Sequence, residues 1–142
     1  MRIRRRLATE ADSARIAILL AELGYPADEK DVRDRVRNSL QSPTSRILVA
    51  EGEGEVVGCL TAELVPYFPD GSTICRITTV VVSVAHRRRG VGASLLVGAA
   101  DFAREHHCSG IEITTAERRL DARRFYEHLG FSRTSLRFFR SL

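Results

Sequence analysis

Apolar residues near the N-terminus follow the spacing of an amphipathic helix. The stripe repeats at i, i+3, i+4 and i+7 through Ile16, Leu19, Leu20 and Leu23. Thr9, with Asp12 three residues later, forms a capping-box pattern ahead of the stripe, and Gly24 and Pro26 provide a stop. The pattern therefore predicts a first helix between Thr9 and Gly24.

A second helix is expected soon after the first. Asp28 offers the N-cap, and the inner face repeats through Val32, Val36 and Leu40. The outer face carries Arg33, Arg35 and Arg37. Two successive amphipathic helices must bury their apolar faces against another apolar surface, which the strands predicted in the rest of the chain would provide.

Runs of β-branched and apolar residues predict a sheet around these helices. The expected strands are residues 2–7, 47–51, 56–65, 74–84, 111–115 and 131–139. Ile3 and Leu7 are expected to point inward from the first strand. Helical spacing returns at residues 90–106 and 120–129. The order β-α-α-β-β-β-α-β-α-β predicts one mixed α/β domain over residues 1–142, with a parallel strand pair joined by a helix.

Composition narrows the class of protein without identifying it. Apolar residues make up 44% and charged residues 28% of the 142 residues, and no apolar run is long enough for a membrane helix. The N-terminus lacks a signal-peptide pattern, so we expect a cytoplasmic protein with no membrane partner. The net charge is +4 and is carried mainly by arginine, which suits phosphate recognition and equally suits a GC-rich gene. Scattered arginines and few aromatic residues do not favour a nucleic-acid partner.

The cysteines do not predict a disulfide framework or a metal site. Cys59, Cys75 and Cys108 are odd in number, lie far apart and lack the spacing of metal ligands. We expect free thiols in or near the core, and no metal.

The strongest chemical pattern is a basic turn with two glycines between a strand and a helix. A β-branched run leads into Arg87-Arg88-Arg89-Gly90-Val91-Gly92, and helical spacing follows. This arrangement can hold a phosphate on backbone N–H groups and on the positive end of a helix dipole. The pair Gly90-x-Gly92 fits neither the dinucleotide fingerprint nor a Walker A loop. A tight turn with surface arginines is the alternative from the turn alone.

A second motif favours the phosphate interpretation. Arg87-x-x-Gly90-x-Gly92 resembles the pyrophosphate-binding signature of the GNAT superfamily of N-acetyltransferases, and residues 121–131 (DARRFYEHLGF) resemble the second motif of the same superfamily. The resemblance covers essentially the whole chain, and residues 23–26 (LGYP) are similar to aminoalkylphosphonate N-acetyltransferases. It implies a mixed, mostly antiparallel sheet of six to seven strands with a central splayed parallel pair and about four flanking helices.

The resemblance implies acetyl-CoA as the donor substrate. The N–H groups of residues 88–93 would hold the pyrophosphate, and the backbone of Val80 and Val82 would bond the pantetheine arm where strand 74–84 splays from strand 111–115. The N–H of Val82 would polarise the thioester carbonyl. The residues expected at the cofactor are Val80, Val81, Val82, Arg87, Arg88, Arg89, Gly90, Val91, Gly92, Ala93, Ser94, Arg119 and Phe125. Arg119 stands where the superfamily often has asparagine.

The same resemblance assigns the catalytic roles. Tyr126 would protonate the departing CoA thiolate as general acid, and a tyrosine packed by its aromatic neighbours is the alternative. The usual glutamate position corresponds to Thr78, which is no base. Glu63 on the preceding strand is our candidate base, with a base reached through water and an exposed strand residue as alternatives. His86 is interpreted as a loop residue and His128 as solvated.

We therefore expect an N-acetyltransferase in which a primary amine attacks acetyl-CoA directly in a ternary complex. A small-molecule amine is the expected acceptor and a protein amine the alternative, bound by the first two helices and loop 66–72. Arg33 and Arg37 either favour an anionic acceptor or form a solvated face. The competing hypothesis is a CoA-binding regulatory module with little catalysis. Dimers are common in the superfamily, so the resemblance also implies a homodimer, with Phe138-Phe139 in its interface.

Overall fold

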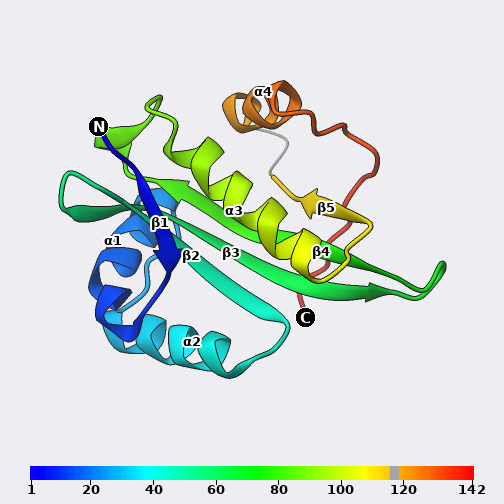
Figure 1. The fold of residues 1–142 in the computed structure, drawn as a ribbon, viewed down its shortest axis with the longest axis horizontal. Coiled ribbons are helices and arrows are strands. Elements are labelled where there is room, and N and C mark those ends of the chain that lie inside the picture. The colour runs from blue at the N-terminus through cyan, green and yellow to red at the C-terminus, as the bar shows by residue number, and fades with distance from the viewer. Residues whose placement is uncertain (116–118) are drawn as a thin grey trace.

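A mixed sheet lies between helices on both of its faces (Figure 1). The computed structural model describes residues 1–115 and 119–142. The strands lie across the sheet in chain order: β1 (Arg4–Leu7), β2 (Ser45–Gly52), β3 (Glu55–Tyr67), β4 (Ser72–Val82) and β5 (Gly110–Ile113). Neighbouring strands from β1 to β4 are antiparallel, whereas β5 runs parallel to β4.

The helices divide between the two faces of the sheet. They are α1 (Ser13–Leu23), α2 (Glu29–Gln41), α3 (Val91–Glu105) and α4 (Leu120–His128), with the 3-10 helices η1 (Glu10–Asp12) and η2 (Val84–His86). Helices α1 and α2 cover one face, and α3 crosses the other (Figure 1). Helix α4 packs on the α3 side through Phe125 and Tyr126. Each face therefore has its own hydrophobic core.

The close approach of α3 to the sheet depends on a glycine in β3. A Cβ atom on Gly58 would lie 2.7 Å from Val91 Cγ1 and 3.1 Å from Leu95 Cδ1. Both of these α3 side chains are buried, next to the fully buried Phe102. A larger residue at position 58 would push the first turn of α3 away from β3.

Most of the predicted order of elements is confirmed, but the last strand is not. Residues 131–142 have no regular secondary structure, so the described sheet has five strands rather than six to seven. The parallel pair of β4 and β5 consequently lies at an edge of this sheet and not at its centre. The tail has strand-like composition, but Phe138 and Phe139 are 89% and 79% exposed, and an extended segment without a ladder partner is no strand. The homodimer through this pair stays a prediction.

Three smaller predictions are wrong for a common reason. Leu7 in β1 and Leu40 in α2 are about half exposed, at 49% and 52%, because each lies at the end of its element, beyond the core. Val84 lies in η2, because β4 ends at Val82 where the chain turns toward α3. The predicted caps are confirmed: Asp28 Oδ1 accepts a 2.8 Å hydrogen bond from the N–H of Asp31, and Gly24 ends α1 with φ of 103°.

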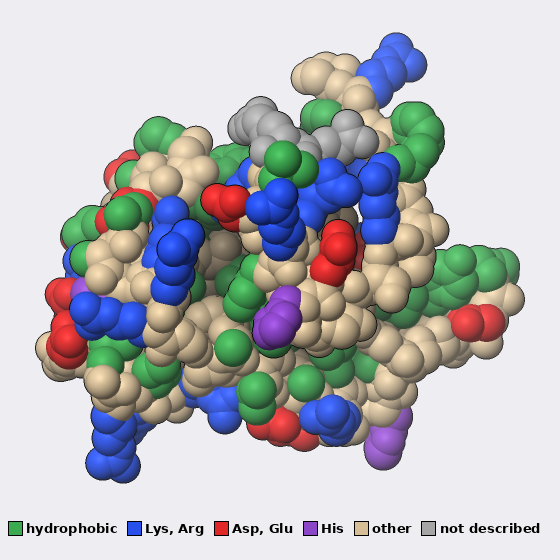
Figure 2. Space-filling view, turned by 90° about the horizontal axis from the view of Figure 1, so that it is seen from above, with side chains coloured by type: hydrophobic (Ala, Val, Ile, Leu, Met, Phe, Trp, Pro, Cys, Tyr) green, Lys and Arg blue, Asp and Glu red, His purple; other side chains and the backbone are tan. Residues whose placement is uncertain are grey.

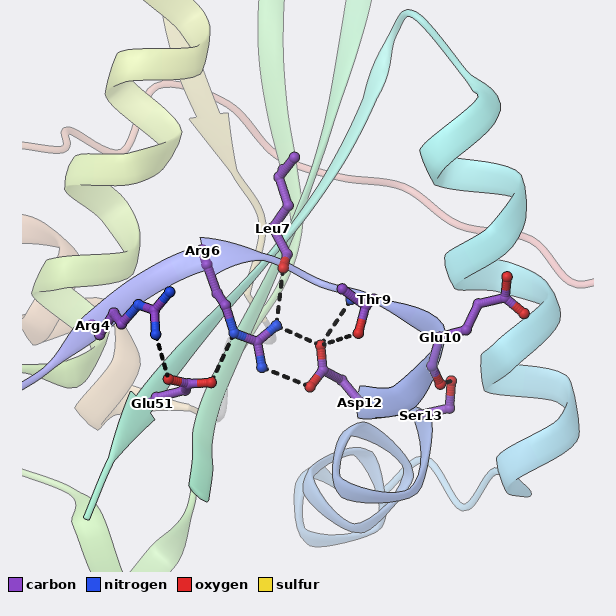
Figure 3. A network of polar contacts seen from close by, with 8 residues as sticks. All are labelled: Arg4, Arg6, Leu7, Thr9, Glu10, Asp12, Ser13 and Glu51. Carbon is purple, nitrogen blue, oxygen red and sulfur yellow. Dashed lines mark hydrogen bonds and ion pairs between the residues drawn. The ribbon is translucent and has the colours of Figure 1, made fainter. Parts of the chain in front are cut away.

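An arginine of β1 ties the sheet to the start of the first helical segment (Figure 3). Arg6 donates to both carboxylate oxygens of Asp12, at 2.7 and 2.8 Å, and to Glu51 at 2.8 Å. Asp12 also accepts from the N–H of Thr9 at 2.8 Å, which confirms the capping box, although the box begins η1 rather than α1. The guanidinium of Arg6 holds the pKa of Asp12 below its usual range.

Two irregularities in β4 create an opening in the sheet. The β3–β4 ladder pairs Thr61 with Thr79 but Ala62 with Ile77, so Thr78 is an extra residue that forms a bulge. On the other side of β4, the ladder with β5 ends at the pair Ile77–Ile113, although β4 continues to Val82. Among the described residues, the last residues of β4 therefore have a strand partner on one side only.

We predict that Asp12→Asn lowers the free energy of unfolding by about 2 kcal/mol, because the half-buried Arg6 loses one of its two charged partners and keeps only Glu51. The depressed pKa of Asp12 gives this contribution a pH dependence: it is fully present above pH 3.8, the ordinary value, and is lost as the pH falls through the lower folded-state value. Denaturant unfolding of both proteins between pH 7 and about pH 2 measures the difference.

The matched control is Arg33→Gln, which removes an exposed i,i+4 ion pair with Glu29 and should change stability by less than about 0.5 kcal/mol. Equal losses in the two variants would contradict a special role for the Arg6–Asp12 pair.

Candidate active site

The last residues of β4, beyond the end of its ladder with β5, have one edge without a ladder partner among the described residues. The N–H of Ser83 donates to the Val57 carbonyl of β3 at 2.8 Å. Because successive residues of a strand point their N–H and C=O groups to opposite sides, those of Val82 and Val80 face away from β3. Their side chains pack in the α3-side core, and Val81 is buried on the other face. On that side the N–H of Val82 and the backbone groups of Val80 have no ladder partner among the described residues, whereas the Val82 carbonyl accepts a hydrogen bond from Arg87 at 3.3 Å. That this backbone binds an extended ligand stays a prediction.

The predicted glycine turn follows directly and leads into the N-terminus of α3. Gly90 is the N-cap, with φ of 83° that favours glycine, and its carbonyl accepts the N–H of Ser94 at 3.0 Å. Within the described residues, the amides of residues 88–93 have no hydrogen-bond acceptor. No acidic residue lies in the first turn of α3, whereas α2 has an aspartate cap and two acidic residues there. The positive end of the α3 dipole is therefore uncompensated and suits an anion.

The structure distinguishes the three arginines of the turn. Arg89 binds Glu53 at 3.1 Å, and the Nε of Arg87 donates to the Val82 carbonyl at 3.3 Å. Arg88, whose φ is +62°, makes no such contact with any described residue. Arg88 is therefore the arginine of this turn that is free to reach a ligand without breaking another contact.

His86, which we interpreted as a loop residue, ends the 3-10 helix η2. It is 8% exposed in η2, and its Nε2 lies 3.2 Å from Glu53 Oε2. The hydrogen bond from His86 is the main reason that the pKa of Glu53 is lowered, with Arg89 adding to it. Glu53 thus connects the β2–β3 turn to η2 and to the glycine turn, a link that sequence spacing could not reveal.

The second predicted motif forms α4 and its C-terminal cap. The N–H of Phe131 donates to the Tyr126 carbonyl at 3.0 Å, and that of Gly130 donates to the Glu127 carbonyl at 3.1 Å. With Gly130 at φ of 93°, this is a Schellman motif, and Phe131 supplies its hydrophobic contact to the Tyr126 ring, 6.0 Å away between centroids. The Gly-Phe pair therefore fixes the end of the helix that carries Tyr126.

Tyr126 is half buried between two aromatic rings, Phe125 and Phe131. Burial raises the pKa of its hydroxyl above 10.0, and the positive charge of Arg119 partly offsets this rise. Arg119 itself is exposed at the N-cap position of α4. His128 is exposed on the same helix, as predicted.

Gly92 is the point at which three predicted site elements meet. A Cβ atom there would lie 3.1 Å from the Phe125 ring of α4 and 3.8 Å from Val82 of β4. The structure therefore brings the end of β4, the first turn of α3 and the tyrosine-bearing helix together. Figure 2, which looks onto the α4 side, shows Lys and Arg side chains gathered near the middle of this face.

A groove of about 490 Å³ opens on the opposite, α1–α2 side of the sheet. Its apolar lining includes Ile16, Leu20, Val32, Val36, Ile47 and Cys59. One polar wall comes from α2 and the residues after it: Arg35, Asn38, Ser39, Ser42 and Ser45. The other comes from β3 and β4: Thr61, Glu63, Thr78 and Thr79. We call this cavity the α2–β4 groove.

Glu63 and the β4 bulge at Thr78 both line the strand wall of this groove. Glu63 is half buried, and the hydroxyls of Thr61 and Thr78 lie 2.7 Å apart beside it. Residues 66–72, which we expected near the acceptor, lie at the tip of the β3–β4 hairpin and do not line the groove (Figure 1). Arg35 and Asn38 are lining residues that the sequence interpretation missed, although their helical spacing places them beside Val32 and Val36.

Other reactive groups in the described residues do not form a site. Burial raises the pKa of Cys59 to about 12 and that of Cys75 to about 11, so neither is a thiolate at neutral pH. Across residues 1–115 and 119–142, no cluster of three or more His, Cys, Asp or Glu side chains could hold a metal ion. In the same ranges, every helix is too short or too polar to cross a membrane.

Known proteins share both the sequence pattern and the fold. A family model described as the acetyltransferase (GNAT) family matches residues 13–131. Aminoalkylphosphonate N-acetyltransferase of Salmonella typhimurium is 30% identical over 138 residues, which cover 96% of this chain and 90% of that protein. Human N-acetyltransferase 8 is 30% identical over 113 residues, which cover 77% of this chain. The chain spans about half the length of this human relative, 48% of it.

Solved structures extend the comparison to the whole chain. A transcriptional regulator from Bacillus halodurans superposes with a TM-score of 0.90 at 27% identity, covering 99% of this chain and 100% of that one. An aminoglycoside N-acetyltransferase in complex with CoA has a TM-score of 0.87 at 17% identity, covering 99% and 95%, and shows the same fold. The family match over most of the sequence, supported by these relatives, establishes that the chain belongs to the acetyltransferase (GNAT) family.

Proposed function

We propose that this N-acetyltransferase transfers the acetyl group of acetyl-CoA directly to a small primary amine. The meeting of β4, α3 and α4 at Gly92 carries the proposal, because it joins an open strand edge, an uncapped helix N-terminus and a protonated tyrosine. The relatives named as acetyltransferases of aminoalkylphosphonates and aminoglycosides support a small amine as acceptor.

The donor half of the site is built mainly from backbone. The free amides of residues 88–93 suit the pyrophosphate of acetyl-CoA, and Arg88 adds a charge that no described residue neutralises. The open backbone edge at Val80 and Val82 suits the amide groups of the pantetheine arm. In this arrangement, the Val82 N–H would donate to the thioester carbonyl as negative charge develops on its oxygen.

Tyr126 would supply the proton that the departing thiolate needs. Burial keeps its hydroxyl protonated at neutral pH, and no described residue accepts a hydrogen bond from it. A thiol has an ordinary pKa near 8.5, so complete proton transfer from a phenol of higher pKa to the thiolate is uphill, and the hydroxyl would act first as a hydrogen-bond donor to the charge that develops on sulfur. The proposed role is therefore to stabilise the leaving group during cleavage of the C–S bond.

The acceptor amine would lie in the α2–β4 groove, with Glu63 as the base that removes its proton. Direct attack is favoured over an acyl-enzyme, because the cysteines of the described chain all have raised pKa values. The hydroxyl pair of Thr61 and Thr78 lines the same wall of the groove as Glu63. They could orient the amine or a water that carries its proton.

We predict that Ala93→Glu separates protein stability from cofactor binding. A carboxylate in the first turn of α3 should stabilise the fold by about 0.3–1 kcal/mol through the helix dipole, while it repels the pyrophosphate. In the wild type, acetyl-CoA at about 100 times its Kd should stabilise the fold by about 2.7 kcal/mol, and this shift should disappear in the variant. Thermal unfolding with and without acetyl-CoA measures both effects.

The neutral control is Ala93→Gln, which has the same shape and should retain most of the shift. If both variants are stabilised by acetyl-CoA as strongly as the wild type, the cofactor does not bind at this helix. If acetyl-CoA binds but no amine is acetylated, the regulatory alternative replaces the enzyme.

We predict that Tyr126→Phe lowers kcat about 100-fold without weakening acetyl-CoA binding, because the ring and its aromatic contacts are retained. The wild-type kcat should not fall through loss of the Tyr126 proton until the pH exceeds 10, because burial raises the pKa above its ordinary value. Steady-state kinetics and the thermal shift of both proteins test this. Unchanged kcat in the variant would assign Tyr126 to packing alone.

A further inference from the structure

We propose that the acceptor of this enzyme carries an anionic group as well as its amine, and that Arg35 binds this group at the α2 wall of the α2–β4 groove. The inference rests on the proposed function and specifies its substrate class. The shared chemistry is a carboxylate, phosphonate or phosphate on a short amine.

Arg35 differs from the two arginines on either side of it in sequence. Arg33 binds Glu29 at 2.8 Å, and Arg37 binds Glu10 at 2.8 Å and Asp34 at 3.2 Å. These pairs occupy the outer surface of α2, so of the two interpretations of Arg33 and Arg37 the structure favours the solvated face over selection of an anion. Arg35 lines the groove instead, and no described residue pairs with it.

The wall around Arg35 is made of hydrogen-bond donors without carboxylates. Asn38 lies one helical turn away and also lines the groove, followed by the hydroxyls of Ser39 and Ser42. A planar guanidinium can bind two oxygens of a carboxylate or phosphonate at once. An amide and hydroxyls beside it can satisfy further oxygens, so this wall fits an anion better than a second ammonium group.

The opposite wall carries the complementary charge. Glu63 lines the groove and has no ion pair with a described residue. Its cross-strand neighbour is Arg76, but Arg76 pairs with Glu112 of β5 at 3.3 Å. One groove thus contains an unpaired cation on α2 and an unpaired anion on β3. A ligand with an ammonium group at one end and an anion at the other would pair both charges.

The test compares two series of primary amines of equal chain length at saturating acetyl-CoA. One series ends in a carboxylate, phosphate or phosphonate, and the other ends in a hydroxyl or methyl group. We expect the wild type to prefer the anionic series by about tenfold or more in kcat/KM, and Arg35→Gln to abolish that preference. The preference is the ratio of kcat/KM between the two series, so a change that affects both series equally leaves it unaltered.

Arg33→Gln is the matched control, because it removes one arginine from the same helix outside the groove. It should keep the wild-type preference, and unchanged melting of both variants with acetyl-CoA verifies their folding. A wild type that ignores the anion, or an Arg35→Gln enzyme that keeps the preference, overturns the inference while the proposed acetyl transfer stands. The wild-type ranking of the three anions identifies which one the site takes.

A calorimetric titration of the same amines into the complex with CoA gives a second measurement that needs no turnover. Selective binding of anionic amines that depends on Arg35 supports the inference, even where transfer is not detected. Absence of acetyl transfer to every amine in the two series, with anion-dependent binding intact, contradicts the proposed function alone.

Discussion

The separation of β4 from β5 is the constraint on which the site depends. Their ladder holds only from Ile74 to Ile77, although β4 continues to Val82. A backbone group without a partner is costly when it is buried, so an open strand edge within a core is retained where a ligand completes it. The α3 crossover follows from the same parallel pair, because parallel strands need a long connection. It places the N-terminus of α3 beside the open edge.

The start of α3, which has no side-chain cap, is the second feature on which the candidate site depends. A side-chain cap commonly accepts hydrogen bonds from the free amides at the start of a helix, as Asp28 does for α2. Gly90 has no side chain, and no acidic residue follows in the first turn. The stability that a cap would give is absent there, and an anionic ligand would supply the missing partner. The fold is held together elsewhere, notably by the Arg6–Asp12 pair between β1 and η1.

The sequence predicted elements well where a residue type has a specific local role, such as capping a helix. Thr9 with Asp12 and Asp28 formed caps as expected, and the helix that starts after Gly90 was located to within a residue. Features that depend on distant partners were not predictable. Residues 131–139 have the composition of a strand but find no ladder, and an extra residue such as Thr78 becomes visible only once β3 is in register.

The two halves of the site differ in how sequence encodes them. The proposed donor half would use backbone amides, so its requirements appear as glycines at fixed spacing, Gly90 and Gly92, that any chain with this fold can share. The proposed acceptor half would use side chains on α2 and β3, where Arg35 and Arg33 look alike in sequence. They differ in the folded protein, because Arg33 forms an ion pair with Glu29 whereas Arg35 lines the groove. Under the proposal made above, the choice of acceptor would depend on which charges remain unpaired after folding, and the motifs alone do not contain this information.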